Sequence, residues 1–153
     1  MQLSAPSRFA LRVLRELARA GETGPLPVAL LARSVGVSTQ FVEQILKPLR
    51  NAGVTRGVRG AGGGYLLDRP LRGISLGEIV RLMEDGVTMA VCCGDKANEC
   101  PRDEACATRR AWDRISRQME EEMEALSLDV FLREDFVCHR ENAPAVSGTG
   151  AST

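Results

Sequence analysis

Apolar residues recur every three or four positions through much of the chain, and segments rich in glycine, proline and serine separate these stretches. Such spacing places the apolar side chains on one face of an α-helix. Serine is a good N-cap, so Ser7, Ser38 and Ser75 each predict a helix start, the last with Glu78 in a capping box. Gly21 and Gly53 predict helix ends. The predicted helices span residues 7–21, 28–34, 38–52, 76–84, 108–126 and 127–132.

A different pattern fills residues 54–67. Two short runs of strand-forming residues, 54–56 and 65–67, flank a glycine-rich segment. This predicts a β-hairpin with Arg56 and Arg59 at its turn. Glycine-rich segments also bind nucleotide phosphates, but neither a Gly-Lys-Ser/Thr motif nor a helix follows this one. The sequence therefore does not support a nucleotide-binding loop.

The predicted helices 28–34 and 38–52 flank a short turn that contains Gly36. In the second helix, apolar side chains face one way and hydrogen-bonding side chains face the other. This arrangement is typical of a helix-turn-helix, although an ordinary helical pair has the same pattern. The hairpin favours DNA binding, because it follows the two helices directly, as the wing does in a winged helix-turn-helix. We expect major-groove contacts from Ser38, Thr39, Gln40, Glu43, Gln44 and Lys47, and a phosphate or minor-groove contact from Arg59.

The two halves of the chain carry opposite charge. Residues 1–73 contain eleven Lys and Arg against four Asp and Glu, a net charge of +7, whereas residues 74–153 contain nine against sixteen, a net charge of −7. A basic half suits contact with DNA phosphates, and an acidic half stays away from them.

The sequence shows neither a leader peptide nor an apolar run of membrane-spanning length, so we expect a cytoplasmic protein without a membrane partner.

Four of the five cysteines lie between positions 92 and 106, in a segment rich in charged residues. In a reducing cytosol, such a cluster more often binds metal or senses redox state than forms disulfides. The gaps between Cys92, Cys100 and Cys106 are wider than those of a zinc site, and they match no ferredoxin spacing. Spacing alone leaves zinc, an iron–sulfur cluster and a thiol switch open.

The chain holds, in order, Glu43-Gln44 in the helix after Gly36, the wing sequence VRGAGGGYLL at 58–67, and the three cysteines. Together these features resemble the Rrf2 family of winged-helix bacterial transcription regulators, which includes iron–sulfur and nitric-oxide sensors. The resemblance implies a mainly α-helical fold with a small β-hairpin wing and a long dimerisation helix. The expected parts are a winged helix-turn-helix DNA-binding domain at 1–73, a cluster-binding loop with dimerisation helices at 74–135, and a disordered tail at 136–153.

The resemblance also implies that Cys92, Cys100 and Cys106 hold an iron–sulfur cluster, with 4Fe-4S favoured over 2Fe-2S. Related sensors add a histidine three residues after the last cysteine, or an aspartate from the first helix of the partner subunit. Here these positions are Arg109 and Arg8, and arginine does not ligate iron. The remaining candidates for the fourth ligand are Cys93, Glu99, Asp103, Glu104 and a small exogenous ligand.

The predicted helix 108–126 is strongly charged but carries an apolar stripe, formed by Trp112, Ile115, Met119 and Met123. A stripe of this length packs either against the helix's own domain or against a partner helix. The resemblance favours a homodimer, which would present two recognition helices to a near-palindromic operator.

We therefore predict a dimeric regulator that binds a double-stranded DNA operator with an affinity set by an iron–sulfur cluster. It would sense redox state, nitric oxide or iron–sulfur status. The alternative is a cluster-free regulator that cycles the loop cysteines between thiol and disulfide. An enzyme is not supported, because the sequence has no Cys-x-x-Cys at a helix start, no histidine near the loop and no acid–base pair.

Overall fold

The computed structural model describes residues 3–21, 23–84, 90 and 106–133. Within these residues the fold is mainly helical with one two-stranded antiparallel hairpin, which confirms the predicted class. None of the described helices is long and apolar enough to cross a membrane. The elements are α1 (Ala5–Ala20), α2 (Val28–Val35), α3 (Thr39–Asn51), β1 (Thr55–Val58), β2 (Gly64–Leu67), the 3-10 turn η1 (Leu71–Gly73), α4 (Leu76–Met83), α5 (Ala107–Ala125) and α6 (Leu128–Phe131).

Helix α1 starts earlier than the sequence predicted. Its N-cap is Ser4, whose hydroxyl accepts a hydrogen bond from the Ser7 N–H at 3.3 Å. Pro6 fits the first turn, because a backbone N–H at this position would have no hydrogen-bond partner within the helix and proline has none to satisfy. Ser7 is fully buried and its hydroxyl donates to Glu84. The prediction of Ser7 as the cap was wrong because this long-range partner is invisible in the local pattern.

The helix-turn-helix forms from α2 and α3 as predicted. Gly36 ends α2 with a φ of 75°, in the left-handed region that glycine adopts without strain. Ser38 caps α3, since its hydroxyl accepts a hydrogen bond from the Phe41 N–H at 3.2 Å. The predicted inner face of α3 packs against α1 and α2, and its members Val42, Ile45, Leu46 and Leu49 are at most 1% exposed.

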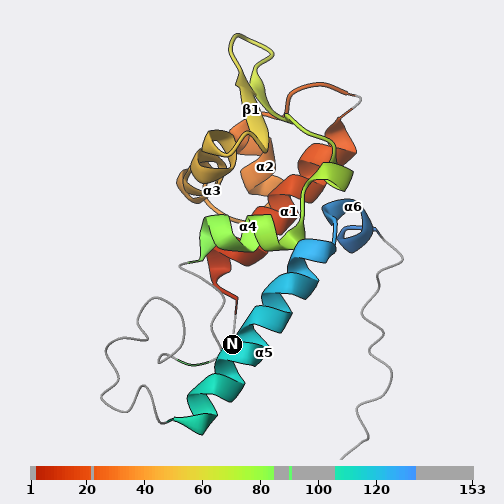
Figure 1. Cartoon of the computed structure of the whole chain (residues 1–153). Coiled ribbons are helices and arrows are strands. Elements are labelled where there is room, and N and C mark those ends of the chain that lie inside the picture. The colour runs from red at the N-terminus through yellow and green to blue at the C-terminus, as the bar shows by residue number, and fades with distance from the viewer. Residues whose placement is uncertain (1–2, 22, 85–89, 91–105, 134–153) are drawn as a thin grey trace, which may run out of the picture.

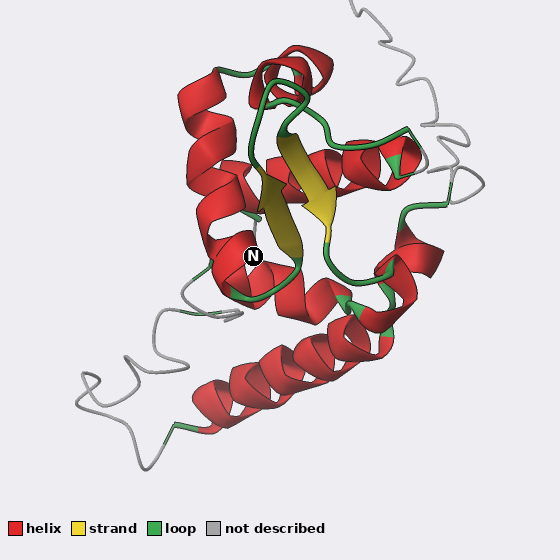
Figure 2. Ribbon diagram, turned by 90° about the horizontal axis from the view of Figure 1, so that it is seen from above, coloured by secondary structure: helices red, strands yellow, loops and turns green. Residues whose placement is uncertain are grey.

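The wing is the hairpin of β1 and β2, with Thr55 opposite Leu67 and Val58 opposite Gly64. Strand β2 is also tied to the segment before α2. The Leu26 N–H donates to the Tyr65 carbonyl at 3.0 Å, and the Tyr65 N–H donates to the Leu26 carbonyl at 2.8 Å. Figure 2 shows the two strands lying over the helices, and Figure 1 shows the hairpin projecting beyond them. The wing is therefore held at a fixed place beside the helix-turn-helix.

Helices α4 and α6 complete the core below α1. Ile79 and Val80 of α4 and Leu128 of α6 are fully buried against residues of α1 and α3. The start of α4 and the end of α5 are joined by backbone hydrogen bonds, Leu76 N–H to the Leu126 carbonyl at 2.8 Å and Leu128 N–H to the Ile74 carbonyl at 2.9 Å. Figure 1 shows the consequence: the C-terminal end of α5 lies on the domain and its N-terminal end extends away.

The capping box of α4 is half formed. Ser75 caps the helix as predicted, accepting a hydrogen bond from the Glu78 N–H at 2.9 Å. The Glu78 carboxylate accepts from the Arg69 guanidinium, and the Ser75 hydroxyl donates to Glu124 of α5 at 2.8 Å. Glu124 also pairs with Arg81, so polar contacts fix the end of α5 onto α4.

Candidate nucleic-acid interface and metal centre

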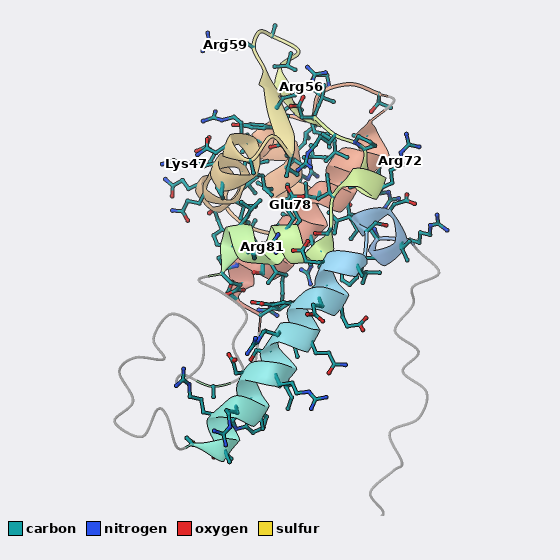
Figure 3. All side chains as sticks on the ribbon, viewed as in Figure 1. Lys47, Arg56, Arg59, Arg72, Glu78 and Arg81 are labelled. Atoms are coloured by element: carbon teal, nitrogen blue, oxygen red, sulfur yellow. The ribbon has the colours of Figure 1, made fainter. Side chains whose placement is uncertain are left out.

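The outer face of α3 is polar and accessible. Every side chain that the sequence predicted for major-groove contact is exposed, a set formed by Ser38, Thr39, Gln40, Glu43, Gln44 and Lys47. The inner face is fully used in the core, so these side chains are free to meet a partner without disturbing the fold. Figure 3 shows Lys47 on the same side of the domain as the wing residue Arg59.

The two arginines of the wing differ in their surroundings. Arg56 forms an exposed ion pair with Asp68, with Nε and Oδ1 3.4 Å apart. Arg59 follows the last residue of β1 at the exposed tip of the hairpin. A cation at the tip of a projecting hairpin is well placed to reach DNA beside a helix in the major groove.

Sequence analysis missed one basic residue of this surface. Arg50 is exposed in the last turn of α3, three residues after Lys47. Residues three apart on a helix are neighbours, so Arg50 extends the polar face towards the wing. The helical spacing itself was the signal that would have found it.

The cysteine loop is described only at its end. Cys106 is half-buried at the N-terminus of α5, with Sγ 3.3 Å from the Thr108 hydroxyl. The pKa of the Cys106 thiol is lowered, first by the hydrogen bond with Thr108, then by the backbone N–H of Arg109, and also by the charge of Arg110. A lowered pKa favours the thiolate, which is the form that binds metal. The chemistry of Cys106 therefore fits a cluster ligand.

The other predicted ligands lie outside the described residues. They are Cys92, Cys93, Cys100, Glu99, Asp103 and Glu104. Among the described residues, no three metal-binding side chains gather into one site. Arg109, at the position where the resemblance implied a histidine, lies in the first turn of α5. The fourth ligand thus stays a prediction.

The base of the loop contacts the start of α1. Glu84, which ends α4, accepts hydrogen bonds from the Ser4 N–H at 2.8 Å and from the buried Ser7 hydroxyl. Burial raises the pKa of Glu84, but the hydrogen bonds from Ser7 and Ser4 outweigh it, and the pKa is lowered. This carboxylate joins the residue before the loop to the helix that packs against α3. Nothing in the local sequence pattern indicated the contact.

The apolar stripe of α5 divides into two parts. Met119 and Met123 pack against the core of their own domain. Trp112 and Ile115 lie nearer the N-terminal end of the helix and are each 41% exposed. Self-packing therefore accounts for the second half of the predicted stripe and leaves the first half open.

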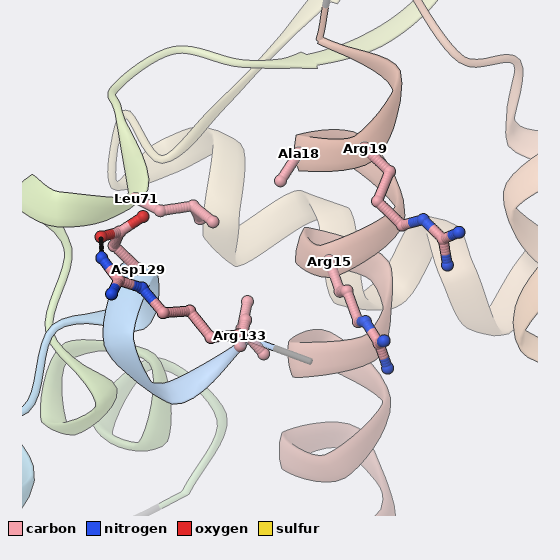
Figure 4. Close-up of a pocket in the computed structure, with 7 residues that line it drawn as sticks. Arg15, Ala18, Arg19, Leu71, Asp129 and Arg133 are labelled. Atoms are coloured by element: carbon pink, nitrogen blue, oxygen red, sulfur yellow. Dashed lines mark hydrogen bonds and ion pairs between the residues drawn. The ribbon is translucent and has the colours of Figure 1, made fainter. Parts of the chain in front are cut away.

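A further hollow of about 240 Å³ lies between α1 and α6. Arg15 and Arg19 of α1 line one side (Figure 4). Asp129 of α6 and Arg133, which follows this helix, line the other side and form an ion pair with a 3.0 Å separation. Its charges are mixed, and it lies away from α3 and the wing.

Comparison with known proteins agrees with the winged helix-turn-helix geometry. The Rrf2 family, described as iron-dependent transcriptional regulators, matches residues 3–134. The HTH-type transcriptional regulator IscR of Klebsiella pneumoniae is 32% identical over 119 residues, which cover 78% of this chain and 72% of that protein.

Solved structures agree with the sequence comparison. CymR (YrzC), the global cysteine regulator of B. subtilis, has a TM-score of 0.71 and 30% identity, covering 86% of this chain and 96% of its own. T. potens IscR has a TM-score of 0.70 and 26% identity, covering 90% and 92% respectively. The family match covers every described residue, and the exposed face of α3 and the adjacent wing agree with it. The chain therefore belongs to the Rrf2 family of DNA-binding transcriptional regulators and is not an enzyme.

Proposed function

We propose that this regulator acts as a homodimer whose affinity for a DNA operator is set by an iron–sulfur cluster on Cys92, Cys100 and Cys106. The observation that carries the proposal is a pair of hydrogen bonds at the base of the cysteine loop. Glu84 accepts one from Ser4, the N-cap of α1, and one from Ser7 in the first turn of that helix. Helix α1 packs on α3, so a change in the loop has a physical route to the DNA-binding face. When bound, the cluster would supply a centre that reacts with oxidants or nitric oxide.

DNA recognition would fall mainly on α3. Glu43 and Gln44 are exposed at the middle of its polar face, and their side chains can read base edges in the major groove. Ser38, Thr39 and Gln40 lie at the N-terminal end, which enters the groove first in this motif. Lys47 and Arg59 would contact phosphates, which fix the position of the protein without reading sequence.

The cluster site would use the three cysteines and one weaker fourth ligand, with Cys93, Glu99, Asp103, Glu104 and a small exogenous ligand as the candidates. Three thiolates with one weak ligand suit a four-iron cluster that is lost readily, a property useful in a sensor. Cys106 is the one cysteine among the described residues, and its lowered pKa, which favours the thiolate, supports this role.

Dimerisation would use the exposed part of α5. Trp112 and Ile115 present apolar surface on a helix that extends away from the domain (Figure 1), and a second copy of this helix would cover it. Met119 and Met123 already pack against their own domain, so they would form the inner edge of this interface. A two-fold dimer would present two copies of α3 to two operator half-sites.

The test is an absorption spectrum of anaerobically purified protein with iron and sulfide counts, followed by operator gel shifts before and after exposure to air and to nitric oxide. We expect a coloured protein with iron and sulfide in equal amounts, whose operator affinity changes when the colour is lost. Cys92→Ala, Cys100→Ala and Cys106→Ala should be colourless, whereas Cys138→Ala is a matched control that keeps the colour.

A thiol switch is the second candidate, because Cys106 is a free and only half-buried thiol, and a thiolate at an accessible position reacts with oxidants. Colourless protein without iron or sulfide, combined with operator affinity that falls on mild oxidation and returns with dithiothreitol, would select this alternative.

A further inference from the structure

A hollow of about 500 Å³ lies where three elements meet. The start of α2, the end of α3 and both strands of the wing contribute to its walls. The lining residues are Pro27, Val28, Arg50, Gly57, Val58, Arg59, Gly63, Gly64 and Tyr65. The hollow is therefore on the DNA-facing side of the domain, between the recognition helix and the wing.

The walls of this hollow carry only positive charge. Arg50 lies on one element and Arg59 on another, and none of the nine described lining residues is acidic. Other hollows of the described surface differ in this respect, because Asp129 lines the one at α6, Glu16 the one at α2, and Glu121 one on α5. Uniform positive charge in a concave site selects an anion.

The backbone around the hollow is closely fitted. A Cβ on Gly64 would lie 2.3 Å from the backbone of Leu26, and a Cβ on Gly63 would lie 2.4 Å from the Val58 carbonyl oxygen. Glycine at position 64 lets the wing approach the segment before α2, where two hydrogen bonds of 2.8 and 3.0 Å hold Leu26 to Tyr65. Glycine at position 63 lets the turn of the wing close on its own backbone. The hollow is thus a fixed feature of the fold.

The position of Arg50 along α3 matches the edge of a DNA groove. Each helical residue advances about 1.5 Å, so Arg50 lies roughly 10 Å beyond Glu43 and Gln44 along the axis. The major groove is about 12 Å wide, so a helix that places residues 43 and 44 against base edges brings Arg50 to the phosphates at the rim.

We propose that this hollow binds one phosphate of the operator backbone, with Arg50 and Arg59 on its two sides. Tyr65 lines the same hollow, and its hydroxyl supplies a neutral hydrogen-bond donor. The inference rests on the proposed DNA binding by α3 and adds a second anchor to it. One phosphate held between helix and wing would anchor both elements to the DNA backbone without reading its sequence.

The test is fluorescence anisotropy of a labelled operator duplex and of an unrelated duplex, measured over a range of salt concentrations. Arg50→Ala should weaken binding to both duplexes by the same factor, roughly five- to fiftyfold. The slope of log K against log salt should fall in magnitude by about 1.8 for a dimer, roughly 0.9 for each copy. Arg72→Ala is the charge-matched control, because Arg72 is exposed on the opposite side of the domain (Figure 3).

Arg50→Lys should restore most of the salt dependence, and Tyr65→Phe should weaken binding to both duplexes by a few-fold with the slope unchanged. Arg50→Ala binding equal to that of wild type would overturn the inference, while wild-type operator binding would still support the proposed function. Wild-type protein that binds neither duplex would overturn both. Inorganic phosphate is the third probe: if it binds wild type tightly and Arg50→Ala not at all, with DNA binding the same in both, the hollow is a free-anion site and the inference fails.

Discussion

Helices α3 and α5 are both amphipathic, but they use their two faces in opposite ways. The apolar face of α3 is buried inside its own domain, with Leu46 and Leu49 fully buried, and its polar face is left for a partner. In α5 the apolar residues Trp112 and Ile115 remain 41% exposed, although the other end of the helix packs on the domain. A polar face left open suits DNA, and an apolar face left open suits a second protein surface. The same sequence period thus leaves two chemically different faces open, one polar and one apolar.

The largest expected effect comes from breaking the apolar face of α5. Ile115→Glu should convert a dimer to a monomer, because the charge would be buried at the interface without a partner. Operator affinity should fall by orders of magnitude, since a monomer binds one half-site only. Light scattering measures the mass. Val130→Glu is the matched control, since Val130 on α6 is also 41% exposed and should leave the mass unchanged. Wild-type protein with the mass of one chain would contradict this prediction.

The polar face of α3 should respond by changing specificity. Glu43→Ala and Gln44→Ala should alter which operator sequences bind, because these residues read base edges. Arg59→Ala should instead weaken binding to all DNA, by about 1 to 3 kcal/mol, with a shallower salt dependence. Binding to a panel of operator variants at several salt concentrations measures both effects. Equal losses with unchanged sequence preference in all three variants would show that α3 is not the reading element.

The smallest effect concerns the contact between the loop base and α1. Glu84→Gln should lower the free energy of unfolding near neutral pH by about 1 kcal/mol, because a charged acceptor is lost at a partly buried site. The folded-state pKa of Glu84 is lowered from 4.5, so its contribution is present above pH 4.5 and is lost as the pH falls through the folded value. Urea unfolding of wild type and of Glu84→Gln, measured between pH 7 and pH 3, should therefore give free energies of unfolding that become equal in acid.

Glu121→Gln is the control for this pH effect, since Glu121 is exposed on α5 and should have little influence on stability at either pH. A difference between wild type and Glu84→Gln that stays constant from pH 7 to pH 3 would mean that the carboxylate charge does not stabilise the contact.

Sequence predicted α3 and the wing well because their signals are local. Ser38 caps the helix, Gly36 ends the preceding one, and the glycine-rich turn separates two short strands. The predicted start of α1 was wrong, because serine is a good N-cap and both Ser4 and Ser7 are serines. The contact that distinguishes them is the hydrogen bond from the buried Ser7 hydroxyl to Glu84, which is distant along the chain. Local pattern is limited in the same way for α5. The helical spacing predicted the apolar stripe, but it did not show which part of the stripe packs against the domain.

The candidate site was predictable in the same uneven way. The exposed residues of α3 follow from helical spacing, and Arg50 was accessible to the same reasoning. The positively charged hollow was not, because it needs Val28, Arg50 and Tyr65 brought together from α2, α3 and β2. The contact of Glu84 with Ser4 and Ser7 also depends on tertiary packing, which local pattern does not encode.

One measurement tests most directly whether a cluster held by the cysteine loop sets operator affinity, as we propose. Operator affinity is compared for cluster-loaded protein, the same protein after cluster removal, and the variants Cys92→Ala and Cys93→Ala prepared anaerobically. We predict that loaded and cluster-free protein differ by roughly 5- to 150-fold, that Cys92→Ala behaves as cluster-free, and that Cys93→Ala stays coloured. By linkage, operator DNA should change cluster stability by the same factor. A colourless Cys93→Ala beside a coloured Cys92→Ala would show that Cys93, and not Cys92, is the first cluster ligand. Equal operator affinities with and without the cluster would contradict the proposal that the cluster sets operator affinity.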